Sequence, residues 1–183
     1  MTHTTIAMLV GSLRKESHNL KLAKALTKLA PEHFSFHVVQ INDLPLYNED
    51  MLEPQPAPVA RLKSDIRSAK GVIFVLPEYN RSIPGGLKNA IDWGSRPPRD
   101  NVWAGKPTGV IGISPGPSGA AMAQQHLRNV LTCVDAPTMQ RPEAFLRYTD
   151  GFFDADGNVS EENRAFLQRW MDTYVAWVQR FVA

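Results

Sequence analysis

Short apolar runs alternate with longer amphipathic segments along the whole chain. Four runs are almost wholly apolar or rich in β-branched and aromatic residues: 6–10, 34–41, 71–76 and 108–113. Runs of this length without a polar side are typical of strands covered on both faces, as in a parallel sheet. Residues 137–145 predict a fifth and weaker strand, because Pro142 interrupts that segment.

Between these runs the apolar positions change to helical spacing. Apolar residues recur every three or four positions in four segments: 22–29, 59–69, 123–134 and 167–181. Strands that alternate with helices imply right-handed crossovers and a doubly wound α/β sheet. The chain shows no internal repeat, low-complexity tract or linker. We therefore expect one domain over residues 1–183.

Composition narrows the classes of partner. With 43% hydrophobic residues among 183, the chain can bury a core, and 20 basic against 18 acidic residues leave a net charge of only +2. This balance argues against a dedicated nucleic-acid binder. No apolar run is long enough to predict membrane insertion. Cys133 alone cannot form an internal disulfide, and its place in an apolar helical segment predicts a small core residue. With no visible signal peptide, we expect a cytoplasmic protein.

Three loops are candidates for the functional site. In an open α/β sheet, ligands bind beyond the carboxyl ends of the strands, where the strand order reverses. The loops that follow the first, third and fourth predicted strands are rich in small and polar residues, and they cover residues 11–19, 77–86 and 114–119. Together they can line one crevice.

The first loop has the parts of a phosphate site. Gly11 allows a sharp turn, Ser12 and Ser17 offer hydroxyls, and Arg14 offers a forked cation. A helix begins near Ser17, so its free N–H groups and its dipole also favour an anion. The alternative is a serine that only caps this helix, beside a solvated Arg14–Lys15 pair. The residues alone leave both interpretations open.

Several other chemistries lack their motifs. The loop after the first strand contains neither the G-x-G-x-x-G dinucleotide fingerprint nor a P-loop. Residues 116–120 only half resemble the nucleophile elbow of a serine hydrolase. The five histidines show no paired metal-ligand spacing, so no metal site is predicted. His18 is the histidine next to the first loop, and we expect it to be a solvated residue at a helix start.

The second loop is the most distinctive. Pro77 ends a buried strand, and polar residues follow until Pro84 sets the first turn of a helix. This loop can offer backbone N–H and C=O groups to a flat heteroaromatic edge. Tyr79 can add a stacking surface, although ordinary packing would also explain it.

Two motifs resemble a known family when they are read together. GSLRKESHN after the first strand and PEYNRSIPGGLKNAIDW after the third are similar to the NADPH-dependent FMN reductase family, which includes quinone and chromate reductases. Residues 44–50 and 104–107 also resemble family segments, and the match runs over about residues 6–143. The resemblance implies a flavodoxin-like fold, with a five-stranded parallel sheet in the order 2-1-3-4-5 and helices on both faces.

The resemblance also implies a cofactor and its site. FMN would be bound, and hydride would pass from NADPH or NADH to the flavin and then to a small-molecule acceptor such as a quinone. No residue need act as acid or base, because the flavin carries the chemistry. The residues that the resemblance assigns to FMN are Ser12, Arg14, Ser17, Asn19 and Leu20 in the first loop, Pro77, Glu78, Tyr79, Asn80 and Ser82 in the second, and Ser114 and Gly116 in the third.

Members of the family form dimers or tetramers with the flavin near a subunit interface, so the resemblance implies a homodimer or homotetramer. Arg81 stands where some relatives carry tyrosine or another residue, and it is a candidate for altering the acceptor pocket or a subunit contact. Arg128 and Glu143 match charged positions and are candidates for subunit contacts. Candidates for a contact to the 2′-phosphate of NADPH are Arg81, Arg96 and Arg99.

Two alternatives remain open from the sequence. A flavodoxin-type electron carrier would bind FMN and take its electrons from a protein partner, but Arg14 and the net charge of +2 make it the weaker interpretation. A member of the family that has lost turnover would act as a binding module. Nothing in the two main motifs indicates such a loss.

Overall fold

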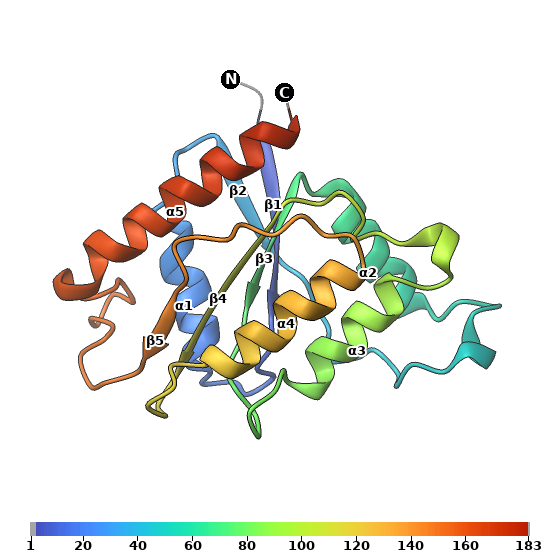
Figure 1. Ribbon diagram of the computed structural model, residues 1–183, viewed down its shortest axis with the longest axis horizontal. Coiled ribbons are helices and arrows are strands. Elements are labelled where there is room, and N and C mark those ends of the chain that lie inside the picture. The colour runs from blue at the N-terminus through green and yellow to red at the C-terminus, as the bar shows by residue number, and fades with distance from the viewer. Residues whose placement is uncertain (1–2, 183) are drawn as a thin grey trace.

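A computed structural model describes residues 3–182 of the chain (Figure 1). Strands and helices alternate along it. The elements are β1 (Thr4–Val10), α1 (His18–Thr27), β2 (Phe34–Val38), α2 (Ala57–Ser68), β3 (Gly71–Val75), α3 (Gly85–Gly94), β4 (Thr108–Ser114), α4 (Ala121–Cys133), β5 (Phe145–Arg147) and α5 (Glu161–Val182), with 3-10 turns at Glu49–Met51 and Pro98–Asp100.

The five strands form one parallel sheet. Its order is β2-β1-β3-β4-β5, and every neighbouring pair is parallel. The chain thus runs outward to β2, returns past β1 to β3, and continues to the other edge. The order reverses between β1 and β3, which is where an open α/β sheet opens a crevice at its carboxyl edge. The predicted flavodoxin-like arrangement is confirmed.

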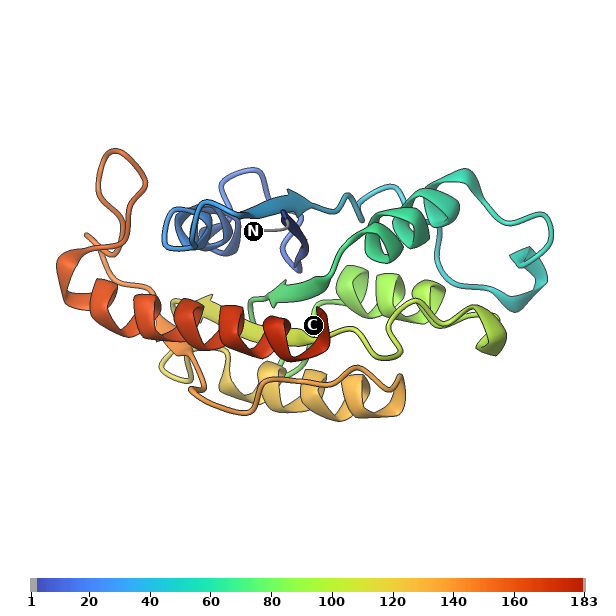
Figure 2. The ribbon, with the colours of Figure 1, turned by 90° about the horizontal axis from the view of Figure 1, so that it is seen from above.

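Helices cover both faces of the sheet. α1 and α5 lie on one face, and α2, α3 and α4 lie on the other (Figure 2). The side chains of β1 alternate accordingly, because Ile6 and Met8 join the core under α1 and α5 while Ala7 and Leu9 join the other core. Burial on both sides explains why this strand is apolar from Ile6 to Val10.

Two glycines let α5 approach the sheet closely. A Cβ at Gly71 would lie 2.8 Å from the Tyr174 hydroxyl, and a Cβ at Gly109 would lie 2.8 Å from the Tyr174 ring and 3.0 Å from Trp170. The Tyr174 and Trp170 rings stack with an interplanar angle of 9°. Two large rings of α5 therefore pack against positions in β3 and β4 that carry no side chain.

The second family motif explains how the segment after β2 is held. Asn89 Nδ2 and Trp93 Nε1 of α3 both donate to the Pro45 carbonyl at 2.8 Å. Asn89 Oδ1 accepts from the Tyr47 N–H, also at 2.8 Å. These side chains are buried, so α3 fixes the course of a long connection that has little regular structure of its own.

The structure corrects the predicted ends of two strands. β2 ends at Val38, earlier than the predicted 34–41. The predicted strand 137–145 is wrong, because β5 covers only Phe145–Arg147. Within 137–145, Thr138 forms an isolated bridge to Thr108, and Pro142 has no N–H to offer a neighbouring strand. Regular pairing with β4 begins only after that proline.

The prediction for Cys133 is also wrong, because its thiol is exposed. Leu127 and Leu131 of the same helix are fully buried. Cys133 follows Leu131 by two residues, about 200° around the helix axis, so it lies on the opposite side. In residues 3–182, no helix is long and apolar enough to cross a membrane.

Candidate functional site

The three predicted loops meet at the carboxyl edge of the sheet, the lower edge in Figure 1. They enclose a cleft of about 260 Å³. Its lining residues come from the first loop and the start of α1 (Ser12, Arg14, Ser17, His18 and Asn19), the second loop (Pro77, Glu78 and Tyr79), and the end of β4 with the third loop (Ile113, Ser114 and Pro115).

The start of α1 presents free donors to this cleft. Ser17 caps the helix, since its Oγ accepts from the Leu20 N–H at 3.3 Å. The N–H groups of His18 and Asn19 have no acceptor in the described part of the chain. Unpaired N–H groups at a helix start carry partial positive charge and bind anions readily. Capping and anion binding, the two interpretations of Ser17, are therefore compatible.

Arg14 and Ser12 complete the first loop. The Arg14 guanidinium donates from Nε and Nη2 to the Glu16 carbonyl, which folds the exposed side chain back along its own loop. Ser12 Oγ accepts from the Tyr79 hydroxyl at 3.4 Å and so links the first loop to the second. A forked cation and a hydroxyl thus stand beside the free N–H groups of α1.

Asn19 holds α1 to the sheet with its side chain. Its Nδ2 donates to the Ile113 carbonyl at 2.9 Å, and its Oδ1 accepts from the Ile113 N–H at 3.1 Å. Both bonds are buried. The amide of Asn19 therefore bonds to both backbone groups of Ile113, and the backbone N–H of Asn19 is the group that the helix start offers to a ligand.

Glu78 caps the start of α4. Its carboxylate accepts from the Met122 N–H at 3.0 Å, the Ala123 N–H at 3.2 Å and the Ser118 hydroxyl at 3.1 Å. Ala120, at the cap position of α4, has no side chain that can do this. Glu78 thus ties the second loop to the third and neutralises the amino end of α4, which is not open to an anion as α1 is.

Residues 79–82 form a tight turn, which we call the 79–82 turn. The Tyr79 and Ser82 backbones donate to each other at 3.0 Å in both directions. Ser82 Oγ lies 2.8 Å from His126 Nδ1 of α4. The sequence did not indicate His126, because no spacing links it to the second loop; the contact depends on how α4 packs beside α3.

His18 differs from its prediction as a solvated residue. Its ring stacks on Tyr148 with centroids 3.7 Å apart, and its Nδ1 is buried without a hydrogen-bond partner among residues 3–182. Burial, followed by the positive charges of Arg14 and Lys21, lowers the pKa of His18 below its usual value. The imidazole is therefore neutral at pH 7 and forms an aromatic side of the cleft.

The cleft gathers most of the residues assigned to FMN. Four of them do not line it: Leu20, Asn80, Ser82 and Gly116. Leu20 packs its side chain against the core under α1 and α5. Ser82 and Asn80 belong to the 79–82 turn at the rim of the cleft, and the Gly116 N–H donates to Ser114 Oγ at 3.3 Å.

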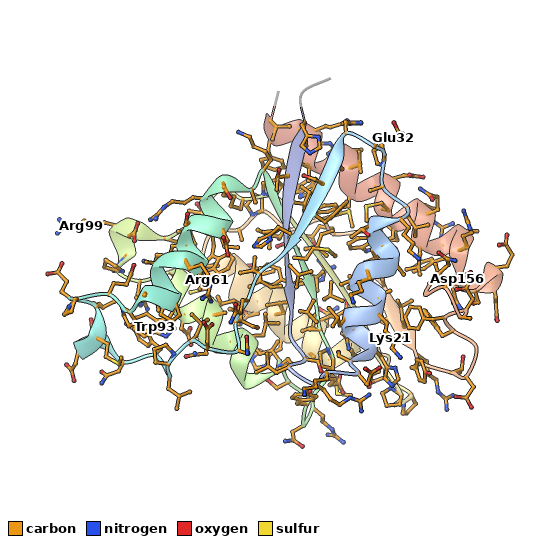
Figure 3. All side chains as sticks on the ribbon, turned by 180° about the vertical axis from the view of Figure 1, so that it is seen from behind. Lys21, Glu32, Arg61, Trp93, Arg99 and Asp156 are labelled. Carbon is orange, nitrogen blue, oxygen red and sulfur yellow. The ribbon has the colours of Figure 1, made fainter. Side chains whose placement is uncertain are left out.

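Two of the three candidate 2′-phosphate contacts lie elsewhere. Arg96 lines a groove between α3 and α4. Arg99 lies at the outer side of the molecule, far from Lys21 near the start of α1 (Figure 3). Arg81 stays at the carboxyl edge, in the 79–82 turn.

Arg128 and Glu143 make contacts within the chain. Arg128 is half-buried, and its Nη1 donates to the Met139 carbonyl at 2.8 Å. Burial lowers the pKa of this guanidinium, opposed by the charge of Glu143. Glu143 Oε1 accepts from Gln125 Nε2 at 2.9 Å. Both residues thus hold α4 to the segment before β5.

Comparison with known proteins decides the family. Residues 4–150 match the family described as NADPH-dependent FMN reductase. This chain belongs to that family. A quinone reductase of Pseudomonas putida is 47% identical over 176 residues, which cover 96% of this chain and 95% of the relative. A 2-hydroxy-1,4-benzoquinone reductase of Burkholderia sp is 49% identical, over 95% of this chain and 96% of the relative.

Solved structures agree with this family. The flavoenzyme NAD(P)H:(acceptor) oxidoreductase FerB from Paracoccus denitrificans has a TM-score of 0.94 at 47% identity, over 97% of this chain and 98% of that one. A flavodoxin from Pseudomonas aeruginosa, with a TM-score of 0.60 at 16% identity, shares the fold alone. The family and the fold predicted from the sequence are confirmed, and the comparisons favour the reductase over the electron carrier.

The residues at the cleft fit FMN, the cofactor of this family. A phosphate needs several donors, and Arg14, Ser12 and the two free N–H groups of α1 supply them. An isoalloxazine needs a flat apolar border with backbone polar groups, and Pro77 and Tyr79 supply such a border. The individual contacts assigned to FMN stay predictions.

Proposed function

We propose that this protein is an FMN-dependent NAD(P)H oxidoreductase that reduces quinones or similar small acceptors. The observation that carries the proposal is the open amino end of α1, where two N–H groups that find no acceptor in residues 3–182 meet Arg14 at one end of the cleft. The family match and the quinone reductases at 47–49% identity support it. When bound, FMN supplies two-electron transfer from the nicotinamide donor to the acceptor.

The residues of the chain bind and orient the cofactor. Ser12, Arg14 and the start of α1 hold the phosphate through charge-assisted bonds. Pro77 and Tyr79 border the ring system, and the neutral His18 on Tyr148 bounds the cleft on another side. Glu78 acts on α4 and keeps the second and third loops together. None of these roles requires a proton transfer by a side chain.

The assembly completes this proposal. We infer one FMN-binding domain that forms a homodimer or homotetramer, with the flavin site near a subunit interface. Support comes from Leu13 and Leu46, large apolar side chains that are 55% and 84% exposed. Burial of such side chains against a second copy of the chain would remove apolar surface from water and stabilise a dimer. Light scattering on the native protein and on Leu46→Asp tests this, and an unchanged monomer in both would contradict it.

We place the protein in the cytoplasm, where NAD(P)H is available. The exposed thiol of Cys133 suits a reducing compartment.

A spectrum of the purified protein tests the main proposal. We expect the protein to show the visible absorbance of a flavin, either as purified or after FMN is added. In the absence of oxygen, NADPH or NADH should bleach this absorbance. A quinone should then restore the colour. A protein that takes up no FMN would contradict the cofactor. Bound flavin that neither nicotinamide reduces would favour an electron carrier instead.

A further inference from the structure

The 79–82 turn projects from the carboxyl edge of the sheet, beyond the other loops there (Figure 1). Its two central residues, Asn80 and Arg81, have φ angles of 51° and 63°. Together with the reciprocal bonds between Tyr79 and Ser82, these angles define a type I′ turn. Such a turn has a fixed shape and presents its central side chains outward.

Arg81 is an unfavourable residue for this conformation. Asn tolerates the left-handed region because its short side chain can bond locally, and glycine is the residue preferred at the second central position. An arginine there costs free energy that glycine would not. Strained residues of this kind are held in place by the surrounding structure and cluster at functional sites.

The guanidinium of Arg81 is available for a ligand. Arg81 is exposed, and its side chain forms no hydrogen bond or ion pair within residues 3–182. The turn beneath it is anchored on both sides, by Tyr79 to Ser12 and by Ser82 to His126. Glu78, the acidic residue closest in sequence, is already bonded to the start of α4. A fixed backbone thus carries, at the rim of the cleft, a cation that has no partner in the described part of the chain.

The chemistry of the donor matches this cation. The 79–82 turn adjoins the cleft through Tyr79, which lines it, so Arg81 stands close to where a nicotinamide donor would bind. NADPH carries a phosphate on the ribose 2′ position that NADH lacks, and a guanidinium binds phosphate through two parallel charge-assisted bonds. A quinone acceptor carries no charge that would need Arg81.

We propose that Arg81 binds the 2′-phosphate of NADPH and gives the enzyme its preference for NADPH over NADH. This inference rests on the proposed function. It selects one of three arginines, because Arg96 and Arg99 lie away from the cleft.

The test compares the FMN-loaded enzyme with Arg81→Gly, Arg81→Lys and the control Arg99→Ala. Arg81→Gly suits the turn and should fold at least as well as the native protein. We expect its KM for NADPH to rise about 10- to 100-fold while kcat and the KM for NADH stay unchanged. The dissociation constant of NADP+, measured by titration of the flavin absorbance, should rise by the same factor and that of NAD+ should not. Arg81→Lys should recover part of the NADPH effect, and Arg99→Ala should match the native enzyme.

Four results would overturn the inference. An equal loss for both nicotinamides would mean that Arg81 acts on a group they share. No loss for either, or a changed oligomeric state of Arg81→Gly in light scattering, would make it a surface or subunit contact. If neither nicotinamide bleaches the bound flavin of the native protein, the proposed function itself fails and the inference fails with it.

Discussion

Glu78 offers the sharpest test of how the site is built. Its carboxylate is the acceptor for the Met122 and Ala123 N–H groups, and α4 has no other cap from a side chain. Losing a helix cap costs about 1 kcal/mol, with a range of about 0.5–2 kcal/mol. Losing a negative charge at a helix amino end costs about 0.3–1 kcal/mol more. We therefore expect Glu78→Ala to lower the free energy of unfolding by about 2 kcal/mol.

Urea unfolding of the apoprotein, followed by far-UV circular dichroism, measures this free energy, and thermal unfolding measures the Tm. Because a protein of this size loses about 2–4 °C in Tm for each kcal/mol, the Tm should fall by about 4–8 °C. Glu161→Ala is the matched control, since Glu161 is an exposed residue in the first turn of α5 and accepts no side-chain hydrogen bond within residues 3–182. Glu161→Ala removes only the favourable charge at a helix amino end, so it should lower the free energy of unfolding by about 0.5 kcal/mol.

The comparison of Glu78→Ala with Glu161→Ala separates the contribution of the hydrogen bonds from that of the charge. If Glu78→Ala destabilises the protein no more than Glu161→Ala does, the three hydrogen bonds to Glu78 contribute nothing and the argument is wrong. Glu78→Gln should fall between the two, because one amide oxygen can still accept from one N–H group.

Three further predictions concern the cofactor, the backbone and pH. Arg14→Ala should weaken FMN binding about tenfold in a fluorescence titration and leave riboflavin binding unchanged, since only FMN has a phosphate; equal affinity for FMN would make Arg14 a surface charge. Gly112→Ala should yield no folded protein, because its Cβ would lie 2.1 Å from the Leu76 carbonyl oxygen, whereas Gly116→Ala, whose nearest neighbour is 3.6 Å away, should keep the native thermal unfolding curve. The apoprotein should lose stability as the pH falls below 6.5, since the lowered pKa of His18 lets the unfolded chain take up a proton that the folded chain does not. His18→Phe should remove that part of the pH slope, and an identical slope in both proteins would show that His18 does not cause it.

The parts of the fold that could be predicted depend on local patterns. Strands such as Gly71–Val75 are buried on both faces, so their apolar runs stand out against amphipathic helices. The edge strand Phe145–Arg147 has only three residues and two exposed side chains, which leaves no pattern to detect. The prediction for Cys133 failed because it used the apolar character of the whole segment, whereas the helical spacing from Leu131 places Cys133 on the opposite side.

In the candidate site, too, features set by local sequence could be predicted and contacts between distant segments could not. The first and second loops could be found because glycine, proline and hydroxyl residues follow buried strands. The roles of Asn19 and Glu78 could not, since each depends on a backbone group 94 or about 40 residues away in the chain. His126 reaches Ser82 only through the packing of α4, and no spacing along the chain records that contact.

The unequal ends of α1 and α4 give the cleft a direction. Both helices begin at the same edge of the sheet, but the amino end of α4 is filled by Glu78 while that of α1 keeps two N–H groups without acceptors in residues 3–182. An elongated molecule with one anionic end and one uncharged end therefore meets two different environments. It is held in one orientation by charge before any specific contact forms, and a molecule charged at both ends is disfavoured. The protein thus selects the pose of its ligand by filling one of two similar helix starts.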